Sequence, residues 1–219
     1  MMRCLLLLLS LVAALGSAAE IDFRGGKPGM VPKDWAVAMT HEGGAPKWEI
    51  VEDATAPSPP HVLAQTSTDN TSGRFPLAVY QKASFADGSV SVRFKPVAGD
   101  RDQAAGIVWR YRDPDNYYIV RANALEDNVV LYKVAGGKRI SLEPKGTPSK
   151  SYGVKQKTPK QTWSTLSVHF HGSTFEVLFD AAKIMEVIDA TFSTAGKVGL
   201  WTKADSVTYF DDFRFERRK

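Results

Sequence analysis

The sequence has almost no cysteine. Of its 219 residues only Cys4 is a cysteine, and it lies before the apolar run Leu5–Leu15. A lipoprotein signal places its cysteine after such a run, at the cleavage point, so we do not expect lipid attachment. The remaining chain has no thiol. This excludes disulfides and thiol catalysis and leaves stability to the packing of a core.

Several functional motifs are also missing. The sequence contains no Gly-rich phosphate loop, no Cys/His zinc spacing, no convincing Ser/His/Asp arrangement and no amphipathic membrane helix. Nucleotide enzymes, zinc fingers and peripheral membrane anchors are therefore not expected. No sustained 3.6-residue apolar stripe occurs either. Residues 181–188 (AAKIMEVI) are the best helical candidate, although Lys183–Val187 also fits a strand.

The N-terminal segment Met1–Ala19 has the pattern of a secretory signal. Arg3 precedes the apolar core, and Ser17-Ala18-Ala19 is a small-residue cleavage site before Glu20. The apolar core is shorter than the ~20 residues that a membrane span needs. We therefore expect a secreted or periplasmic protein without a membrane span, whose residues 20–219 form a single domain.

Charge gives little support for nucleic-acid binding. Of the 28 Lys and Arg residues only Arg3 lies in the signal segment, and none of the 24 acidic residues does, so the remainder has a net charge of +3 (27 − 24). The basic residues are scattered, apart from Arg217-Arg218-Lys219 at the end. A small charge without a basic patch predicts no nucleic-acid partner.

The clearest structural pattern is Ala105–Asn123, AGIVWRYRDPDNYYIVRAN. Two runs of β-branched and aromatic residues flank Asp113-Pro114-Asp115-Asn116, whose residues favour a turn. Val129–Val134 follows, and Gly136-Gly137 leads into Lys138–Leu142. The spacing predicts a four-strand antiparallel meander.

Other segments alternate polar and apolar residues with the period of half-buried strands. Leu77–Phe85 and Gly88–Phe94 are expected to pair around Asp87-Gly88. Further candidate strands are Ile21–Phe23, Lys47–Val51, His61–Gln65, Thr162–His171, Thr174–Phe179, Gly196–Thr202 and Val207–Glu216. Many short strands with regularly spaced turns predict an all-β sandwich or jelly roll of two antiparallel sheets.

Three stretches carry a family resemblance: AGIVWRYRDPDNYYIVR, TWSTLSVHFHGSTFEVLFD and TFSTAGKVGLWTKADSVTYFDDFRF. They resemble the concanavalin-A-like lectin/glucanase superfamily, and within it the secreted bacterial 3-keto-disaccharide hydrolase domain family and its laminin-G-like relatives. The resemblance implies a concanavalin-A-like jelly-roll sandwich that binds sugars on a concave sheet.

Enzymatic function has mixed support in the residues. Related glucanases carry a Glu-x-Asp-x-(x)-Glu strand. Glu20-Ile21-Asp22 matches only its start, so a retaining glucanase is not expected. The resemblance also implies action on 3-keto sugars, where a base and a cation stabilising an enolate suffice. Arg110, Arg121 and Lys203 are candidate cations. The alternative is that the two arginines pair with carboxylates such as Glu126.

Aromatic side chains are the second group of candidate ligand contacts. Trp201 is out of phase with Val198 and Leu200, so we expect it on the opposite face, near Lys203. Tyr117 is in phase with Arg121. Both rings either stack on a sugar or pack in a core. The predicted substrate-binding set is Arg110, Arg121, Trp201, Lys203 and Tyr117.

Histidine and aspartate give possible metal ligands. His169 and His171 lie two apart on a strand, where solvent exposure is the main alternative to metal binding. Superfamily sandwiches often bring the closing strand near the first one, here Asp212 near Asp22. These two residues are the predicted ligands of a structural Ca²⁺, and the alternative is an Asp bonded to loop amides.

Taken together, the sequence predicts a secreted jelly-roll domain that recognises carbohydrate. A hydrolase or lyase acting on a 3-keto disaccharide or glucoside is the first alternative. A laminin-G-like protein-interaction module without a sugar site is the second.

Overall fold

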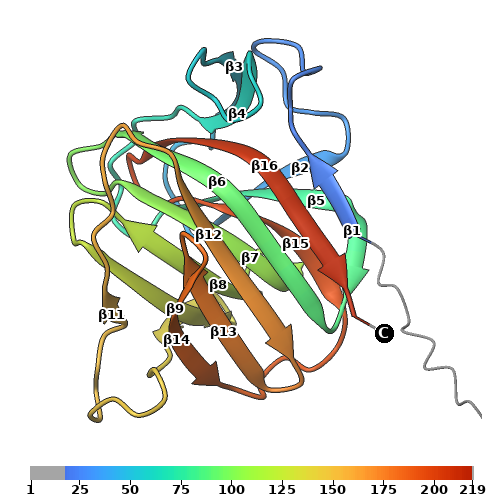
Figure 1. Cartoon of the computed structure of the whole chain (residues 1–219). Helices are drawn as coiled ribbons and strands as arrows, with labels where there is room; N and C mark the ends of the chain where they lie inside the picture. The colour runs from blue at the N-terminus through green and yellow to red at the C-terminus, as the bar shows by residue number, and fades with distance from the viewer. Residues whose placement is uncertain (1–17, 219) are drawn as a thin grey trace, which may run out of the picture.

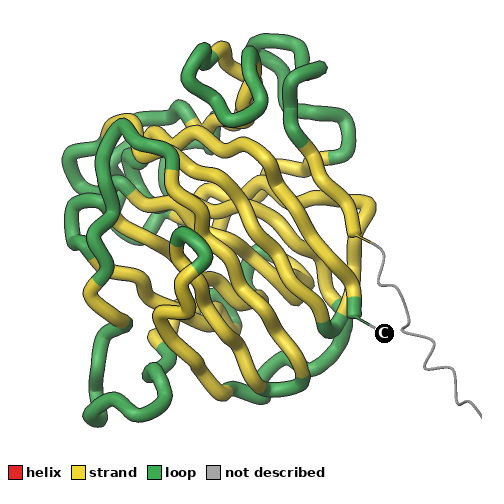
Figure 2. The backbone as a smooth tube through the Cα atoms, viewed as in Figure 1, coloured by secondary structure: helices red, strands yellow, loops and turns green. Residues whose placement is uncertain are grey.

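The computed structural model describes residues 18–218, and in this range the chain forms strands and loops without an α-helix. Figure 1 shows two sheets stacked face to face, with β6, β12 and β16 in the front sheet and β7, β8 and β15 behind. Loops join the strands mainly at the two ends of the stack (Figure 2). The predicted all-β sandwich of two antiparallel sheets is confirmed. In the described range no helix is long and apolar enough to cross a membrane.

The front sheet, sheet A, has eight strands. Its order is β14-β13-β12-β6-β16-β4-β3, and β1 pairs with β16. The strands are β1 (Ala18–Ile21), β3 (Trp48–Glu52), β4 (His61–Gln65), β6 (Gly88–Ala98), β12 (Ser164–His171), β13 (Thr174–Phe179), β14 (Ala182–Ile188) and β16 (Val207–Arg217). Ala18 and Ala19 of β1 belong to the predicted signal segment, whose other residues lie outside the described range.

The rear sheet, sheet B, also has eight strands. Its order is β10-β9-β8-β7-β15-β5-β2, and β11 pairs with β9. The strands are β2 (Trp35–Thr40), β5 (Phe75–Phe85), β7 (Ala104–Asp113), β8 (Asn116–Asn123), β9 (Asn128–Ala135), β10 (Lys138–Ser141), β11 (Val154–Lys155) and β15 (Gly196–Trp201).

The predicted meander is confirmed as β7-β8-β9-β10. The β7–β8 turn is closed by the Asp113 carboxylate, which accepts hydrogen bonds from the Asp115 amide and the Asn116 side chain. Gly136 and Gly137 both have positive φ in the β9–β10 turn. Local turn chemistry therefore determines this part of the sheet.

The expected pairing of Leu77–Phe85 with Gly88–Phe94 is wrong. β5 pairs with β2 and β15 in sheet B, whereas β6 pairs with β12 and β16 in sheet A. The turn between them carries the chain from one sheet to the other. Alternation of side chains shows which face of a strand is buried but not which strand lies beside it.

Three smaller expectations also need correction. Residues 181–188 are not helical, because β14 directs Met185 and Val187 into the core with a period of two. The first strand ends at Ile21, since Phe23 has a positive φ of 46°. The sequence analysis also missed β2. Its residues Ala36 and Val37 are exposed at an edge, so they do not alternate clearly.

The main core lies between the two sheets and is rich in rings. Trp109 stacks on Tyr118 and Phe170 with centroid separations of 5.4 and 5.9 Å. At the other side, Trp35 packs edge-on against Phe213 at 5.1 Å. Since this core contains no cysteine, burial of these aromatic and aliphatic side chains holds the sheets together.

Candidate functional site

The outer face of sheet B, which faces away from the main core, is concave because the sheet curls until its two edges meet. His41 follows β2 at one edge of the sheet, and Gly137 lies in the β9–β10 turn at the other edge. The two meet where His41 Nε2 donates to the Gly137 carbonyl over 2.6 Å. Nearby, the Thr40 hydroxyl donates to the Pro114 carbonyl over 2.6 Å. We call the concave outer face of sheet B the trough.

Apolar and aromatic side chains fill the bottom of the trough. They form a second cluster, separate from the main core, made of Phe75, Leu77, Val79, Ala104, Val108, Tyr117, Ile119, Val130, Tyr132, Val134 and Trp201. The Arg139 guanidinium lies over three of the rings, 4.6 Å from Phe75, 4.5 Å from Tyr132 and 5.9 Å from Trp201. This cation–π stacking covers the rings that the sheet leaves on its outer side.

A connected set of polar side chains lies at the end of the trough formed by the β6–β7 and β8–β9 loops. We call it the polar network; its members are Asp102, Arg121, Asn123, Glu126, Asn128, Tyr132, Tyr152 and Lys203. Arg121 and Asp102 are each only 1% exposed. Charged side chains are rarely buried to this degree unless they are paired, so their partners explain how they are tolerated.

Arg121 is the centre of the polar network. Its Nη2 donates to Glu126 Oε2 over 2.8 Å and to the hydroxyls of Tyr132 and Tyr152, each over 3.2 Å. Its Nη1 donates to Asn128 Oδ1. The two tyrosine hydroxyls also hydrogen-bond to each other. One guanidinium thus joins β8, β9 and the loop that carries Tyr152.

Asp102 is the second buried charge. Its Oδ2 lies 2.7 Å from Lys203 Nζ, and its Oδ1 accepts a hydrogen bond of 2.8 Å from Asn123 Nδ2. The same Asn123 amide nitrogen donates to Glu126 Oε1 over 3.1 Å. Asn123 therefore connects the Asp102–Lys203 pair with the Arg121–Glu126 pair.

The pKa values reflect these contacts. Burial alone raises the pKa of Glu126, but Arg121, Asn128 and Lys203 together outweigh this effect, and the pKa falls below its usual value. Burial disfavours the charged form of Arg121, yet Tyr132 and Glu126 raise its pKa overall. Burial raises the pKa of Tyr132. Near neutral pH the network therefore contains an ionised Glu126, a cationic Arg121 and a neutral Tyr132.

Solvent reaches only part of the network. The Tyr152 residue is 50% exposed, the Glu126 side chain 36% and the Lys203 side chain 19%. These three groups present a phenol, a carboxylate and an ammonium at the surface, while the groups that hold them are buried. A rigid buried support under a few accessible polar groups is the usual construction of a binding site.

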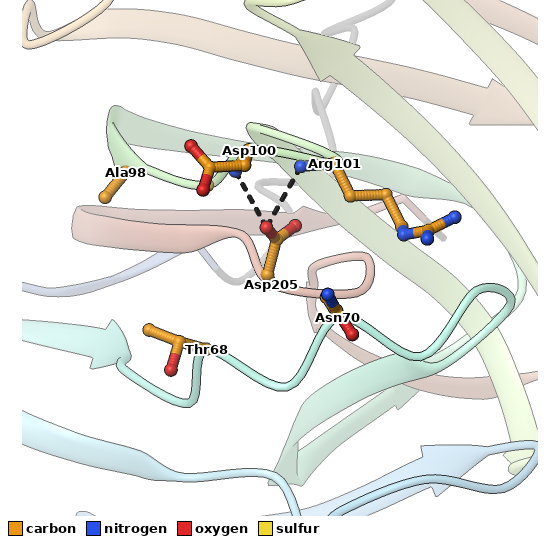
Figure 3. Close-up of a pocket in the computed structure, with 7 residues that line it drawn as sticks. Thr68, Asn70, Ala98, Asp100, Arg101 and Asp205 are labelled. Atoms are coloured by element: carbon orange, nitrogen blue, oxygen red, sulfur yellow. Dashed lines mark hydrogen bonds between the residues drawn. The ribbon is translucent and has the colours of Figure 1, made fainter.

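A hollow of about 510 Å³ adjoins the network on the side of the loops (Figure 3). Thr68, Asn70, Arg101 and Asp205 are among the residues that line it. The Asp205 carboxylate accepts hydrogen bonds from the amides of Asp100, Arg101 and Asp102. These amides hold its pKa below the usual value against the effect of burial. Asp205 thereby fixes the loop from which Asp102 reaches Lys203.

Four of the five predicted substrate-binding residues lie on the trough face. Tyr117 and Trp201 belong to the apolar cluster, whereas Arg121 and Lys203 belong to the polar network. The opposite orientation expected for Trp201 is confirmed, since Val198 and Leu200 lie in the main core. The rings of Tyr117 and Trp201 are fully buried, so they support the site from beneath its surface.

Arg110 lies elsewhere, at an end of the main core. Its donors bind the carbonyls of Ala86, Phe192 and Gly172 over 2.6–2.8 Å, and Asp87 Oδ1 over 3.2 Å. Its backbone has φ 47°, at an irregularity where β7 meets β15. Arg110 therefore joins three loops of the fold and is separate from the polar network.

The two predicted calcium ligands lie near each other in sheet A. Ile21 pairs with Phe213, so Asp22 and Asp212 flank the same register. Asp22 accepts from Arg24, and Asp212 accepts from the Ser58 hydroxyl over 2.7 Å. Within residues 18–218 no three His, Cys, Asp or Glu side chains gather as metal ligands. The carboxylates of Asp22 and Asp212 alone do not fit Ca²⁺, which takes six to eight oxygen ligands. The calcium site stays a prediction.

Regular alternation along a strand predicts that Asp211 and Asp212 of β16 point to opposite faces, but they do not. Asp212 has φ 47°, and the register of β16 against β6 shifts after Asp211. Both carboxylates consequently reach Ser58, Asp211 through the amide and Asp212 through the hydroxyl. A bulge of this kind breaks the alternation on which the expectation depended.

Sequence reasoning missed Asp102, Asn123, Tyr132, Tyr152 and Arg139 as parts of the site. Glu126 entered only as the alternative partner of Arg121, and this pairing is what the structure contains. The polar run from Asn123 to Asn128 between two apolar strands was the available signal. No sequence signal pointed to Tyr152, because its loop reaches the site only through tertiary structure.

The fold and the outer-face site define a class: a β-sandwich with concanavalin-A-like and galectin-like structural neighbours. The carbohydrate-binding module CBM66 from Bacillus subtilis aligns with a TM-score of 0.61 and 18% identity, over 83% of this chain and 94% of that one. Domain 4 of the extracellular arabinanase AbnA from Geobacillus stearothermophilus, in complex with arabinotriose, gives 0.56 and 12%, over 93% of both chains. A putative glycosyl hydrolase from Parabacteroides distasonis gives 0.52 and 14%, over 88% and 100%. At these identities the likeness shows the fold alone.

The sequence itself matches a defined family over most of its length. Residues 29–216 match the 3-keto-alpha-glucoside-1,2-lyase-like domain, so the chain belongs to this family. No curated protein matches the chain. The family resemblance in the sequence is thereby confirmed.

Proposed function

We propose that the polar network binds a carbohydrate at the loop end of the trough. The observation that carries the proposal is the arrangement around Arg121: buried charges hold Glu126, Lys203 and Tyr152 at the surface, where donors and acceptors stand side by side. Sugar hydroxyls both donate and accept, so a mixed set of this kind suits them.

The relatives support this ligand class. The CBM66 protein is named as a carbohydrate-binding module, and the arabinanase domain is described in complex with arabinotriose. The adjoining hollow of about 510 Å³ lies within the range of ligand sites in proteins and adds Asn70 and Arg101 to the available polar groups.

A glycan array followed by calorimetric titration of the best ligand tests the proposal. Tyr152→Ala removes an exposed ring and hydroxyl, and Glu126→Gln removes a charge while keeping the shape. Each is expected to weaken binding about tenfold or more. Glu52→Gln is a matched control, because Glu52 is exposed at the end of β3 and belongs to neither the hollow nor the network. An array without ligands, or equal affinities for all variants, contradicts the proposal.

Elimination from a 3-keto glucoside is the second candidate, and family membership favours it. A ketone at C3 acidifies the C2–H bond. Glu126 takes this proton, and the electron pair forms an enolate that Lys203 stabilises. Collapse of the enolate breaks the C1–O bond, which yields an unsaturated keto sugar and an alcohol whose proton comes from Tyr152. Atoms and charge balance without an added oxidant.

Turnover of a 3-keto glucoside separates the two candidates. For a lyase, Glu126→Gln abolishes formation of the unsaturated product while the variant still binds the substrate. For a binding domain, the unchanged protein retains the glucoside without forming product. Mass spectrometry distinguishes elimination from hydrolysis, because only hydrolysis adds water.

A further inference from the structure

The outer face of sheet A carries a second set of polar side chains in register across four strands. Glu176 of β13 pairs with His169 of β12, His169 pairs with Ser89 of β6, and Ser89 pairs with Glu216 of β16. Their neighbours Val168, Val90 and Phe215 belong to the main core. Since side chains alternate along a strand, the row Glu176–His169–Ser89–Glu216 points outward.

Two hollows lie along this row and share Ser89 and Glu216. One has a volume of about 510 Å³ and is lined by His169, His171, Glu176 and Arg218 among others. The other has about 410 Å³ and extends past Ser91 and Arg214 to β1. We call the two together the sheet A groove; the strands that carry it, β6, β12 and β16, belong to the front sheet in Figure 1.

The floor of the groove is made of small residues. Gly88 and Ser89 occupy β6 between the long side chains of β12 and β16. A Cβ at Gly88 would lie 2.1 Å from the Glu216 carbonyl, and Gly88 has φ 155°. Glycine is therefore required at one end of the floor, and serine keeps the next position open.

The groove is lined by accessible groups of two kinds, some paired, as His171 is with Asp87, and some without a partner in the described range. Among residues 18–218, no hydrogen-bond or ion-pair partner is found for the side chains of Ser89, His169, Glu216 or Arg218, whereas Glu176 pairs with Lys183 and Arg214 pairs with Glu20. A carboxylate, an imidazole, a guanidinium and a hydroxyl thus face the same space. This mixture offers acceptors and donors in similar number.

We propose that the sheet A groove binds a neutral oligosaccharide laid across strands β12, β6 and β16. Polyhydroxylated chains match a polar groove with both donors and acceptors. Glu20 is paired with Arg214 and Glu176 with Lys183, and the Glu216 carboxylate lines the same hollow as Arg218. The charges around the groove therefore balance, which favours a neutral ligand over an anionic one. The groove is distinct from the trough, so the protein holds two glycan chains or two parts of one chain.

NMR titration of the full chain with neutral hexasaccharides tests this inference. The probes are cellohexaose, xylohexaose and arabinohexaose, with hexagalacturonate as the anionic comparison. We expect at least one neutral probe to shift amide signals of residues 88–91, 167–171 and 214–217. Ser89→Leu fills the floor and is expected to weaken that binding at least tenfold, as is Glu216→Gln. Tyr152→Ala is the matched control in the trough and should leave these shifts unchanged.

The outcomes separate this inference from the proposed function. Shifts confined to residues 121–132 and 203 would support the trough site and overturn the groove. The groove is also overturned if no neutral probe shifts the sheet A signals, if Ser89→Leu leaves those shifts intact, or if hexagalacturonate binds there more tightly than every neutral probe. Failure of Tyr152→Ala to affect any ligand contradicts the trough proposal alone.

Discussion

The two outer faces of the sandwich treat polar groups in opposite ways. In the trough, Arg121 and Asp102 are buried and paired with Glu126 and Lys203, and Asn123 donates to the carboxylates of Asp102 and Glu126. In the sheet A groove, His169 and Glu216 are exposed and have no partner among residues 18–218. The difference follows from curvature, because the curled sheet B removes its polar side chains from water and each must then be paired.

This contrast changes what a substitution measures. A buried, paired charge contributes to folding as well as to binding, since removing one member leaves the other without its partner. An exposed, unpaired group contributes little to stability. Loss of binding after mutation is therefore ambiguous in the trough and direct in the groove. Matched variants separate the contribution to folding from the contribution to binding.

The largest effect is expected for Arg121→Met. The variant leaves Glu126, Asn128 and two tyrosine hydroxyls without their shared donor, so we expect a loss of about 3 kcal/mol in the free energy of unfolding. Glycan binding at the trough should also disappear. Urea unfolding measures the first effect and calorimetry the second. A change below about 0.5 kcal/mol would show that the network does not stabilise the fold.

Arg110→Lys is the matched comparison for Arg121. Lysine cannot supply the forked donors that reach Ala86, Phe192 and Gly172 together, so we expect a loss of about 2 kcal/mol. Because Arg110 is separate from the network, binding at both faces should persist below the unfolding temperature. Loss of glycan binding in this folded variant would instead place Arg110 in a ligand site.

Arg121 and Arg110 show how much of the fold and of the site can be predicted from the sequence. Alternation and turn residues predict the two sheets, the meander and the common face of Tyr117, Arg121 and Trp201, because these depend on local chemistry. Arg110 does not follow this alternation, because a backbone irregularity in β7 turns its side chain toward the loops. The partners of Arg121 could be guessed only in part. Glu126 is five residues away, whereas Tyr152 arrives on a distant loop.

Strand pairing shows the same limit at a larger scale. β5 and β6 are adjacent in sequence and each has an apolar face, yet they belong to different sheets. Neither pattern nor propensity encodes this, because the same turn suits a hairpin and a crossing between layers. The sheet A groove depends on that crossing, since it places Ser89 beside β12 and β16.

The pKa shifts of two carboxylates have opposite signs: Asp211 is buried in β16 of sheet A, and the half-buried Glu126 lies in the β8–β9 turn. Burial raises the pKa of Asp211 in sheet A to about 6, and the nearby Asp212 and Asp22 act in the same direction. The unfolded value is ~3.9, so between pH 4 and 6 the native state binds more protons and stability falls as pH rises. Glu126 behaves oppositely. Its lowered pKa stabilises the fold above the unfolded value of ~4.3, and this contribution is lost as pH falls.

We therefore expect Asp211→Asn to gain stability relative to the unchanged protein as pH rises from 4 to 7, by about 2 kcal/mol. The variant removes a titrating group, although one of the amides of Ser58 and Asp212 loses an acceptor. Urea unfolding at pH 4, 5, 6 and 7 gives the difference between the two proteins. A difference that stays constant over this range would mean that Asp211 is ionised in the fold at every pH.

The smallest expected effect on stability is that of Glu216→Gln in the sheet A groove. Its side chain is exposed and makes no contact whose loss would cost folding energy, so the free energy of unfolding should change by less than about 0.5 kcal/mol. Binding of the neutral hexasaccharide should nevertheless weaken, because the Glu216 carboxylate lines the hollow without a partner among residues 18–218, whereas Glu176 is paired with Lys183. A large loss of stability would reveal a partner for Glu216 and would remove the distinction between the two faces, since the groove would then be held by pairing as the trough is.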